Sequence, residues 1–534
     1  MIRSQRHPLA AIFLRPLFAE PGKTVRLSEV MAGLILIFAL LLLTCLVFPA
    51  EGIRLSSRFT LTFPSLQDIL GISERSAETS FSIDCSEEGF SNFAGDPDRF
   101  EKSALPMKCT PEQIRALPVQ PIEYPKGRKD VLDNIMLELT ALRSGNRGLV
   151  RILHYGDSQL EADRMTMYLR GQLQKEFGGG GVGYVALNPQ IPINPTVKIS
   201  MSDDWSYSVP AVNYKQQAPL RVGHMLSSAS FSPKRQKVSW IKVERRPIRS
   251  YPSLRFSRVK LLLANSRAPI FLEAKTLTET IFTSVIQPNA AVQELSLVVP
   301  NNQESVTLYF RGNGNPEIYG LALDHSAGVA VDNIPLRSSS GIDFVKADMQ
   351  LLEKSYKLID AKFVIMQFGA NVVPQSKKSY SYYEEQLYRQ LALIKQLIPK
   401  VSILVVGVSD MARRSNGVLA SYPNIAKIRN AQRQAAFRAG CAFWDTYEAM
   451  GGKNSIISWA YANPMLATKD FCHFSNAGAA LVTELLYRSF SRDLKRYMAA
   501  AGKVEKGTGK GTEKGTGKDA EKDVTSLAEN STSQ

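Results

Sequence analysis

The sequence predicts an α/β protein whose three-layer parallel-sheet domain is interrupted by an inserted all-β sandwich, behind an N-terminal transmembrane helix. Three observations predict this fold class. Residues 361–368 and 402–408 are near-continuous apolar runs, which are typical of strands buried on both faces of a parallel sheet. Between about 188 and 331 the pattern changes to short strands separated by Asn, Pro and Gly turns. Residues 30–50 are uncharged and long enough to span a bilayer as a helix.

The chain has 534 residues, which is too long for one hydrophobic core, so several domains are expected. After residue 500 the sequence becomes Lys-Gly-Thr repeats, which bury no apolar surface and are expected to be disordered. We predict the following segments: a cytoplasmic basic segment (1–29), a transmembrane anchor (30–50), an extracytoplasmic spacer (51–126), the first part of the α/β domain (127–196), the inserted β-sandwich (197–332), the second part of the α/β domain (333–499) and a disordered low-complexity tail (500–534).

The apolar stretch at 30–50 favours a retained anchor in the inner membrane. Basic residues precede it, so by the positive-inside rule that end stays in the cytoplasm and the rest of the chain is periplasmic or otherwise extracytoplasmic. A cleaved signal peptide is the alternative, but the stretch is longer than a usual signal core and Phe48-Pro49-Ala50 is a poor cleavage site. A lipid anchor on Cys45 is disfavoured by Thr44 before it and by the apolar residues after it.

The formal net charge is +16, a balance that raises the question of a nucleic-acid partner. No stripe of Lys and Arg interleaved with aromatic residues is present, and no recognition motif is found. We therefore interpret the positive charge as diffuse surface charge and expect no nucleic-acid partner.

Five cysteines are present, and one of them, Cys45, lies in the predicted anchor. Cys85 and Cys109 lie in the exported spacer, where an oxidising compartment favours a disulfide, with two unpaired thiols as the alternative. Such a bridge would stabilise the fold by roughly 3–4 kcal/mol in the chain-entropy model. Cys441 and Cys472 lack metal-ligand spacing and are interpreted as buried structural thiols.

The first part of the α/β domain contains a strand, a tight turn and a helix around one serine. Residues 131–142 have helical apolar spacing and lead into a strand at 149–155, which Gly156 ends. Ser158 follows, and from Leu160 apolar residues recur at helical spacing. This order places a hydroxyl at the carboxyl edge of a parallel sheet, beside the positive end of a helix dipole. The glycine run at 178–183 lacks the Lys-Ser/Thr ending of a phosphate loop and is interpreted as a helix stop.

The predicted sandwich contains four prominent aromatic residues, Trp205, Tyr207, Trp240 and Tyr319. Such side chains either stack on sugar rings or, as is more common in β-sandwiches, fill the hydrophobic core.

The second part of the α/β domain continues with alternating strands and helices. The strand at 361–368 is followed by Gly369-Ala370-Asn371, a helix at 382–397 and the strand at 402–408. A helix at 425–439 and a short strand at 441–445 follow. Then Asp470-Phe471-Cys472-His473 precedes an amphipathic helix that reaches about Met498.

Three polar segments thus stand at the ends of predicted parallel strands, at Gly156-Asp157-Ser158, at Gly369-Ala370-Asn371 and at Asp470-Phe471-Cys472-His473. Acyl transfer needs a nucleophile, a base, a group that orients the base and donors for the oxyanion. The chain holds all four residue types, in this order.

At these residues the chain resembles the SGNH (GDSL-type) hydrolase superfamily, over roughly 125–195 and 333–498. The resemblance implies that Ser158 is the nucleophile, His473 the general base and Asp470 its orienting carboxylate. It also implies that Asn371 contributes its side chain to the oxyanion hole. The remaining block of the superfamily is normally a glycine that donates its backbone N–H. Here Ser338 takes that place, with Ser339 and Gly341 as alternatives.

The β-module between the first two blocks, together with the segment 154–159 around Ser158, resembles exported bacterial peptidoglycan O-acetylesterases, which carry a carbohydrate-binding-like insert. The resemblance implies a membrane-anchored serine esterase that removes O-acetyl groups from a cell-envelope glycan, peptidoglycan or another polysaccharide, without cofactor or metal. Three alternatives remain open. An O-acetyltransferase would act with a membrane-bound O-acyltransferase partner, and a lipid or thioester hydrolase would need an apolar acyl channel. A non-catalytic glycan-binding protein would use the β-module alone.

Overall fold

The computed structural model describes residues 118–508 except 189–194, 210–218, 232–237, 247–254, 301–302 and 416, together with residues 31, 34–36, 53–56 and 59–61. The chain divides into two units, Met1–Thr79 and Ser80–Gln534. In the first unit, β1 (Ile53–Ser56) and β2 (Phe59–Leu61) form an antiparallel pair. Within the ranges just given, no helix has both the length and the apolar character needed to cross a bilayer.

Several predictions concern residues outside these ranges. They are the basic segment 1–29, nearly all of the anchor at 30–50, the Cys85–Cys109 pair, most of the spacer and the part of the tail after residue 508. The predicted start of the tail is wrong, since helix α14 (Asn476–Thr508) continues through residues 500–508. Three successive alanines, at 499–501, favour this continuation because alanine has the highest helix propensity.

The second unit contains a six-stranded sheet in the order β16-β4-β17-β18-β21-β3. The first five strands are parallel, and β3 pairs with β21 in the antiparallel direction. Their bounds are β3 Ile122–Glu123, β4 Leu149–Gly156, β16 Gly328–Pro335, β17 Ala361–Gln367, β18 Ser402–Val406 and β21 Ala442–Trp444. The predicted parallel sheet is therefore present, with the serine strand β4 inside it.

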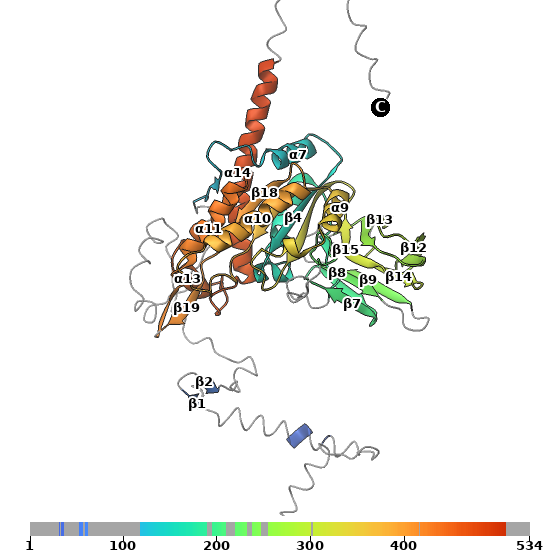
Figure 1. Cartoon of the computed structure of the whole chain (residues 1–534), viewed down its shortest axis with the longest axis horizontal. Helices are drawn as coiled ribbons and strands as arrows, with labels where there is room; N and C mark the ends of the chain where they lie inside the picture. Colours follow the sequence, from blue (N-terminus) through green and yellow to red (C-terminus); the bar gives the residue numbers. More distant parts are fainter. Residues whose placement is uncertain are drawn as a thin grey trace, which may run out of the picture. The chain divides into compact units, whose positions relative to one another are not determined.

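Helices cover both faces of this sheet. Along β4, Leu153 and Tyr155 pack into one hydrophobic core, whereas Val150 and Ile152 pack into another. Because successive side chains of a strand point to opposite faces, these two cores lie on opposite sides of the sheet. The first core includes α9 (Met349–Ile359), α10 (Ser381–Leu397) and α11 (Ile425–Arg438). The second includes α7 (Asp133–Arg143), α8 (Thr166–Phe177) and α14. Figure 1 shows α10 and α11 lying across the strands β4 and β18.

Two further sheets, both antiparallel, form the β-sandwich. One has the order β13-β10-β15-β8-β7, with β5 also paired to β15, and the other has the order β12-β11-β14-β9-β6. Leu261, Leu272 and Phe310 belong to the core that they share. The bounds are β5 Gly183–Val185, β6 Val197–Met201, β7 Trp205–Ser208, β8 Ser228–Phe231, β9 Ser239–Arg245, β10 Arg258–Ala264, β11 Ile270–Lys275, β12 Thr280–Ile286, β13 Gln293–Val298, β14 Ser305–Arg311 and β15 Glu317–Asp324.

Three elements differ from the predicted segment assignments. β16 begins at Gly328, inside the segment assigned to the sandwich, and β3 lies inside the segment assigned to the spacer. β5 pairs with β15 of the sandwich although it precedes residue 197. The start of β16 could not be predicted from sequence because only three residues separate β15 from β16. No turn-rich segment therefore marks the end of the sandwich and the start of the sheet.

Two of the four aromatic residues are buried, Trp205 in the core of the sandwich and Tyr319 in the core of the α/β part. Trp205 is 9% exposed and packs edge-to-face on Phe231, with ring centroids 5.0 Å apart. Tyr319 is 1% exposed, and its hydroxyl donates to Glu317. For these two residues the prediction of a core position is therefore confirmed, and stacking on sugar rings is not supported.

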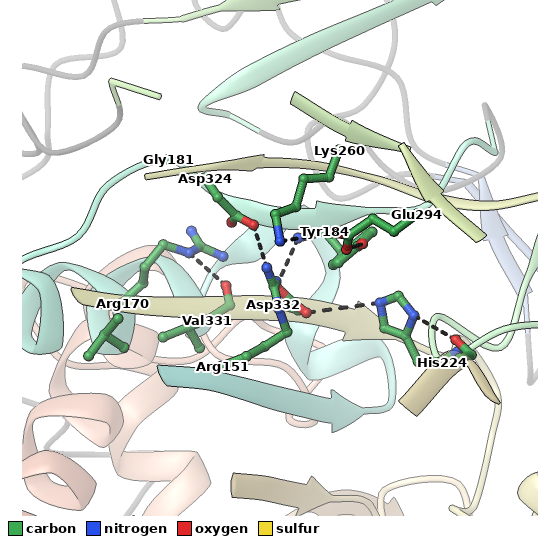
Figure 2. Close-up of polar contacts among 12 residues, drawn as sticks. Arg151, Arg170, Gly181, Tyr184, His224, Lys260, Glu294, Asp324, Val331 and Asp332 are labelled. Carbon is green, nitrogen blue, oxygen red and sulfur yellow. Dashed lines mark hydrogen bonds and ion pairs between the residues drawn. The ribbon is translucent and has the colours of Figure 1, made fainter. Parts of the chain in front are cut away.

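A buried ionic cluster joins the sandwich to the parallel sheet. Arg151 of β4 is 1% exposed and lies between Asp324, which ends β15, and Asp332 of β16 (Figure 2). Its Nη1 atom is 2.6 Å from Asp332 Oδ1, and its Nη2 atom pairs with Asp324. The same Asp332 oxygen accepts the backbone N–H of Tyr184, at 2.8 Å, and the Tyr184 ring lies 4.7 Å from the Arg151 guanidinium. Three strands that belong to two modules therefore meet on one guanidinium.

Candidate active site

The strand β4 ends in a turn that only glycine fits. A Cβ atom on Gly156 would lie 2.7 Å from the Gln367 carbonyl oxygen and 2.7 Å from the Leu160 side chain. The backbone N–H of Asp157 donates to that same carbonyl, at 3.2 Å, which holds the turn against β17. The chain then forms a 3₁₀ helix at Ser158–Asp163, and α8 begins only at Thr166. The predicted continuous helix from Leu160 is therefore wrong, because Ala162 and Asp163 adopt left-handed backbone angles, φ 56° and 57°.

The structure brings Ser158, His473 and Asp470 together, although Ser158 and His473 are 315 positions apart in the sequence. Ser158 Oγ lies 2.7 Å from His473 Nε2. On the other side of the ring, His473 Nδ1 lies 2.6 Å from Asp470 Oδ2. The three side chains thus form a continuous hydrogen-bonded chain, in the geometry of a nucleophile, a base and an orienting group.

Asp470 is held in its ionised form. Partial burial opposes ionisation, but hydrogen bonds from His473, Thr468 and two backbone N–H groups outweigh burial and lower the pKa of this carboxyl to about 2. A carboxylate at Nδ1 can only accept, so Nδ1 carries the ring proton and Nε2 is left with a lone pair directed at the Ser158 hydroxyl. The neutral ring is therefore in the tautomer that accepts a proton from the serine.

The turn after β17 is connected to the loop after β16. Asn371 donates from Nδ2 to the carbonyl oxygen of Ser339, at 2.8 Å. Leu336, at the start of that loop, donates its N–H to the Gly156 carbonyl at 2.7 Å. The predicted oxyanion donors Asn371 and Ser338 thus lie in adjacent loops at the carboxyl edge of the sheet, where the serine turn also lies.

Among the three backbone donors considered for the missing glycine, Ser338 is the available one. The N–H of Ser339 donates to the Leu336 carbonyl at 3.0 Å, and that of Gly341 donates to Ser339 Oγ at 2.9 Å. Within the described part of the chain, the N–H of Ser338 has no hydrogen-bond partner. Ser338 also has φ 63°, the left-handed conformation that glycine adopts most readily. The N–H of Ser158 likewise has no partner among these residues.

Two residues that hold the site together were missed by the sequence analysis. Asp157 is 2% exposed and accepts the N–H groups of Gln159, at 3.0 Å, and Ala370, at 3.2 Å. It therefore connects the serine turn to the turn of Asn371, and burial raises its pKa to about 6. Arg164 donates to the carbonyl oxygens of Ser158, at 2.6 Å, and Phe474, at 3.0 Å. Asp157 stands in the motif itself, whereas nothing in the sequence pattern marks Arg164.

The described residues contain no group of three or more His, Cys, Asp and Glu side chains placed to hold a metal ion. Cys441 and Cys472 are both free thiols; the first is buried and the second is half-buried. Burial raises the pKa of each thiol to about 12, so neither is a thiolate at neutral pH. The predicted burial is confirmed for Cys441 but not for Cys472, which is only half-buried.

No protein-family model and no curated protein sequence matches the chain. Among solved structures, a peptidoglycan O-acetylesterase is similar, with a TM-score of 0.54 and 19% sequence identity, over 68% of this chain and 96% of that chain. A family two carbohydrate esterase from Cellvibrio japonicus has a TM-score of 0.23 and 7% identity, over 57% of this chain and 99% of that chain. A family 29 carbohydrate-binding module has a TM-score of 0.19 and 13% identity, over 28% of this chain and 89% of that chain. The first of these likenesses establishes the fold, and at that level it agrees with the resemblance predicted from the sequence motifs.

Proposed function

We propose that this chain, whose fold is similar to that of a peptidoglycan O-acetylesterase, is a serine esterase that removes O-acetyl groups from a cell-envelope glycan. One observation carries the proposal. Ser158 Oγ, His473 Nε2, His473 Nδ1 and Asp470 Oδ2 are linked by contacts of 2.7 Å and 2.6 Å at the carboxyl edge of a parallel sheet. Ligands of such sheets bind at that edge, so the nucleophile stands where a substrate arrives.

In the first half of the reaction, Ser158 Oγ forms a bond to the acetyl carbonyl carbon while its proton moves to His473 Nε2. The tetrahedral intermediate then breaks its bond to the sugar oxygen. That oxygen leaves as the sugar hydroxyl, with the proton from His473, and the acetyl group stays on Ser158. Asp470 remains ionised throughout, since its pKa is about 2, and it stabilises the positive charge that develops on the ring.

In the second half, water replaces the sugar. His473 takes a proton from water as the water oxygen attacks the acetyl carbon, and it returns that proton to Ser158 Oγ as acetate departs. The same imidazole therefore acts as base and then as acid in each half.

The oxyanion that forms in both halves needs hydrogen-bond donors in place beforehand. We assign this role to the Asn371 side chain and to the backbone N–H groups of Ser338 and Ser158. The free state of both N–H groups among the described residues supports the assignment, as does the second Nδ2 hydrogen of Asn371, which the contact with Ser339 leaves available.

The glycan substrate and the membrane location are parts of the same proposal. The similar solved enzyme acts on peptidoglycan according to its name, and the Arg151–Asp324 ion pair joins the β-sandwich of this chain to the sheet that carries Ser158. The uncharged stretch at 30–50 supports an anchor with the catalytic part outside the cytoplasm. Protease added to spheroplasts should then remove the catalytic part, and its full protection would contradict this topology.

Turnover of an acetylated glycan by the purified full-length chain tests the function. We expect release of free acetate from O-acetylated peptidoglycan and from 4-nitrophenyl acetate, and loss of both activities in Ser158→Ala without loss of the folded state. Ser206→Ala is the matched control, because Ser206 is an exposed serine of the sandwich. Acetyl groups recovered on an added acceptor glycan, in place of free acetate, would favour transfer over hydrolysis. Full activity of Ser158→Ala would disprove the assignment.

A further inference from the structure

The side chain of Gln159 connects residues 158–164, the serine segment, to residues 468–474, the histidine loop. Gln159 follows Ser158 directly and is 4% exposed. Its Nε2 atom donates to the carbonyl oxygen of Cys472, at 2.7 Å, and its Oε1 atom accepts the backbone N–H of Phe474, at 3.2 Å. Cys472 and Phe474 are the two neighbours of His473, so one amide group holds the backbone on both sides of the histidine.

The histidine loop has few other polar connections to the segment that carries Ser158. Within the loop, Thr468 donates its N–H to the His473 carbonyl at 2.8 Å, and Asp470 accepts the N–H of His473 at 3.1 Å. Those bonds set the shape of the loop but not its position relative to the serine. Between residues 158–164 and 470–474, the polar contacts in the described chain are the Ser158–His473 bond itself and those of Gln159 and Arg164.

The chemistry of the contact requires both ends of an amide. The Cys472 carbonyl needs a donor and the Phe474 N–H needs an acceptor, and the glutamine side chain offers both on one carbon. A glutamate in its place keeps the acceptor, but its second oxygen faces the Cys472 carbonyl and repels it while the carboxylate is ionised. A leucine leaves two buried backbone groups without partners.

We propose that Gln159 is a positioning residue that fixes the distance between Ser158 Oγ and His473 Nε2 by holding the backbone on both sides of the histidine. The inference rests on the proposed function, because the distance matters only where His473 takes the serine proton. Gln159 itself touches neither the substrate nor the reacting atoms. A misplacement of about 1 Å at such a contact lowers the rate on the order of 10²-fold.

Another buried glutamine provides a matched control. Gln174 of α8 is 5% exposed and donates from Nε2 to the carbonyl oxygens of Gly181, at 3.1 Å, and Val329, at 3.2 Å. It resembles Gln159 in burial and in its use of backbone partners, but among the described residues it makes no hydrogen bond to the histidine loop. Gln174→Leu should therefore lower the stability of the fold, because it removes a buried amide, but it should not change the position of His473.

The test measures kcat and KM for 4-nitrophenyl acetate, thermal unfolding, and the rate at which a fluorophosphonate labels Ser158, in the full-length chain. We expect Gln159→Leu to lower kcat and the labelling rate by about 10²-fold with little change in KM. Gln174→Leu should lower the unfolding temperature and leave kcat and labelling unchanged. The ratio of Gln159→Glu to wild-type rates should rise as the pH falls, because a protonated glutamate again donates to the Cys472 carbonyl.

Two results would separate this inference from the proposed function. Wild-type activity that Ser158→Ala abolishes but Gln159→Leu leaves intact would overturn the positioning role while the esterase stands. Equal losses of kcat in Gln159→Leu and Gln174→Leu would also overturn it, since a general effect on stability would then explain both. A wild-type chain that neither hydrolyses acetyl esters nor reacts with the fluorophosphonate would overturn the proposed function, and the positioning role would fall with it.

Discussion

Asn371 spans two loops of the active-site edge, because its amide donates to the Ser339 carbonyl 2.8 Å away. Under the proposed function, removing this side chain deletes one oxyanion donor, and it also removes the hydrogen bond to the loop of Ser338. We expect Asn371→Ala to lower kcat on the order of 10²–10³-fold, as for the loss of one such donor, with KM nearly unchanged.

Asn134→Ala is the control for this variant, because Asn134 also donates an amide hydrogen to a backbone carbonyl, that of Lys400 at 2.6 Å. Lys400 precedes the amino end of β18, so this bond lies at the edge of the sheet opposite to the candidate site. Steady-state kinetics with 4-nitrophenyl acetate compare the two. Equal kcat values for Asn371→Ala and the wild type would remove Asn371 from the oxyanion hole.

Asp410 makes the stability of the fold depend on pH near neutrality. It is fully buried, and burial raises its pKa to about 7 although Ser421 and the Ile456 N–H donate to it, at 2.9 Å and 3.0 Å. Because the folded-state pKa exceeds the ordinary value, the protonated carboxyl favours folding. This contribution is fully present below about pH 4 and is lost as the pH rises through about 7.

We therefore expect the free energy of unfolding to fall by about 1 kcal/mol between pH 6 and pH 8, from this group alone. The buried carboxyls Asp157 and Asp332 have pKa values of about 6, so most of their effect lies below this window. Asp410→Asn should flatten the dependence when urea unfolding is followed at several pH values. If the free energy of unfolding of Asp410→Asn fell with pH as steeply as that of the wild type, a group other than Asp410 would cause the pH dependence.

Ser158, Asp470 and His473 could be singled out from sequence because three motifs stand in a fixed order at strand ends, and the structure brings the three side chains together. The contacts of Gln159 and Arg164 could not be predicted, because they form only when the loop around residue 473 folds against the serine turn. Ser338 was predicted as a backbone donor from its position in the sequence alone. In the described part of the chain, the combination of its left-handed φ and its N–H without a partner distinguishes it from Ser339 and Gly341.

At the scale of elements, the start of α14 is packed against the chain that precedes the histidine loop. A Cβ atom on Gly478 would lie 1.8 Å from the Leu466 carbonyl oxygen, which already accepts the Ser475 N–H at 2.9 Å. A backbone oxygen cannot move aside as a flexible side chain would. We expect Gly478→Ala to push helix and loop apart, lowering both kcat and the unfolding temperature.

Gly148→Ala provides the comparison, since a Cβ there meets only the Asn146 side chain at 3.7 Å, an ordinary contact. Circular dichroism melts and acetate release measure the two effects. A Gly478→Ala protein with wild-type melting and rate would show that the helix start tolerates the added methyl group.

Most elements of the α/β part were predictable because apolar runs and helical spacing mark them strongly. The helices predicted at 382–397 and 425–439 correspond closely to α10 and α11. The errors lie where local pattern is ambiguous. β3 has only two residues, too few for any periodicity, and the 3₁₀ segment after Ser158 has a helix-like sequence although two of its residues adopt left-handed angles.

At the scale of the whole second unit, Ser80–Gln534, one guanidinium connects the sandwich and the parallel sheet. Replacing Arg151 leaves Asp324 and Asp332 buried without their cation, and removing one partner of a buried ion pair typically costs about 3–5 kcal/mol. We expect Arg151→Met to lower the free energy of unfolding by this amount in chemical denaturation.

Arg128→Met is the matched control, because Arg128 pairs with Asp130 at 2.8 Å on the surface, where both side chains are more than half exposed. Its unfolding should match that of the wild type. If Arg151→Met proved as stable as Arg128→Met, packing of the strands rather than the ionic cluster would hold the two modules together.

The 315 positions between Ser158 and His473 have a consequence for the newly made protein. Translation proceeds from the N-terminus, so the nucleophile leaves the ribosome long before the base and its carboxylate do. The strands on both sides of β4, β16 and β17, also follow it in the chain, the first after the entire sandwich. A nascent polypeptide therefore carries a serine without its general base, and under the proposed function it is latent. Under the same proposal, esterase activity begins only when the segment around His473 has been synthesised and folded against the serine turn.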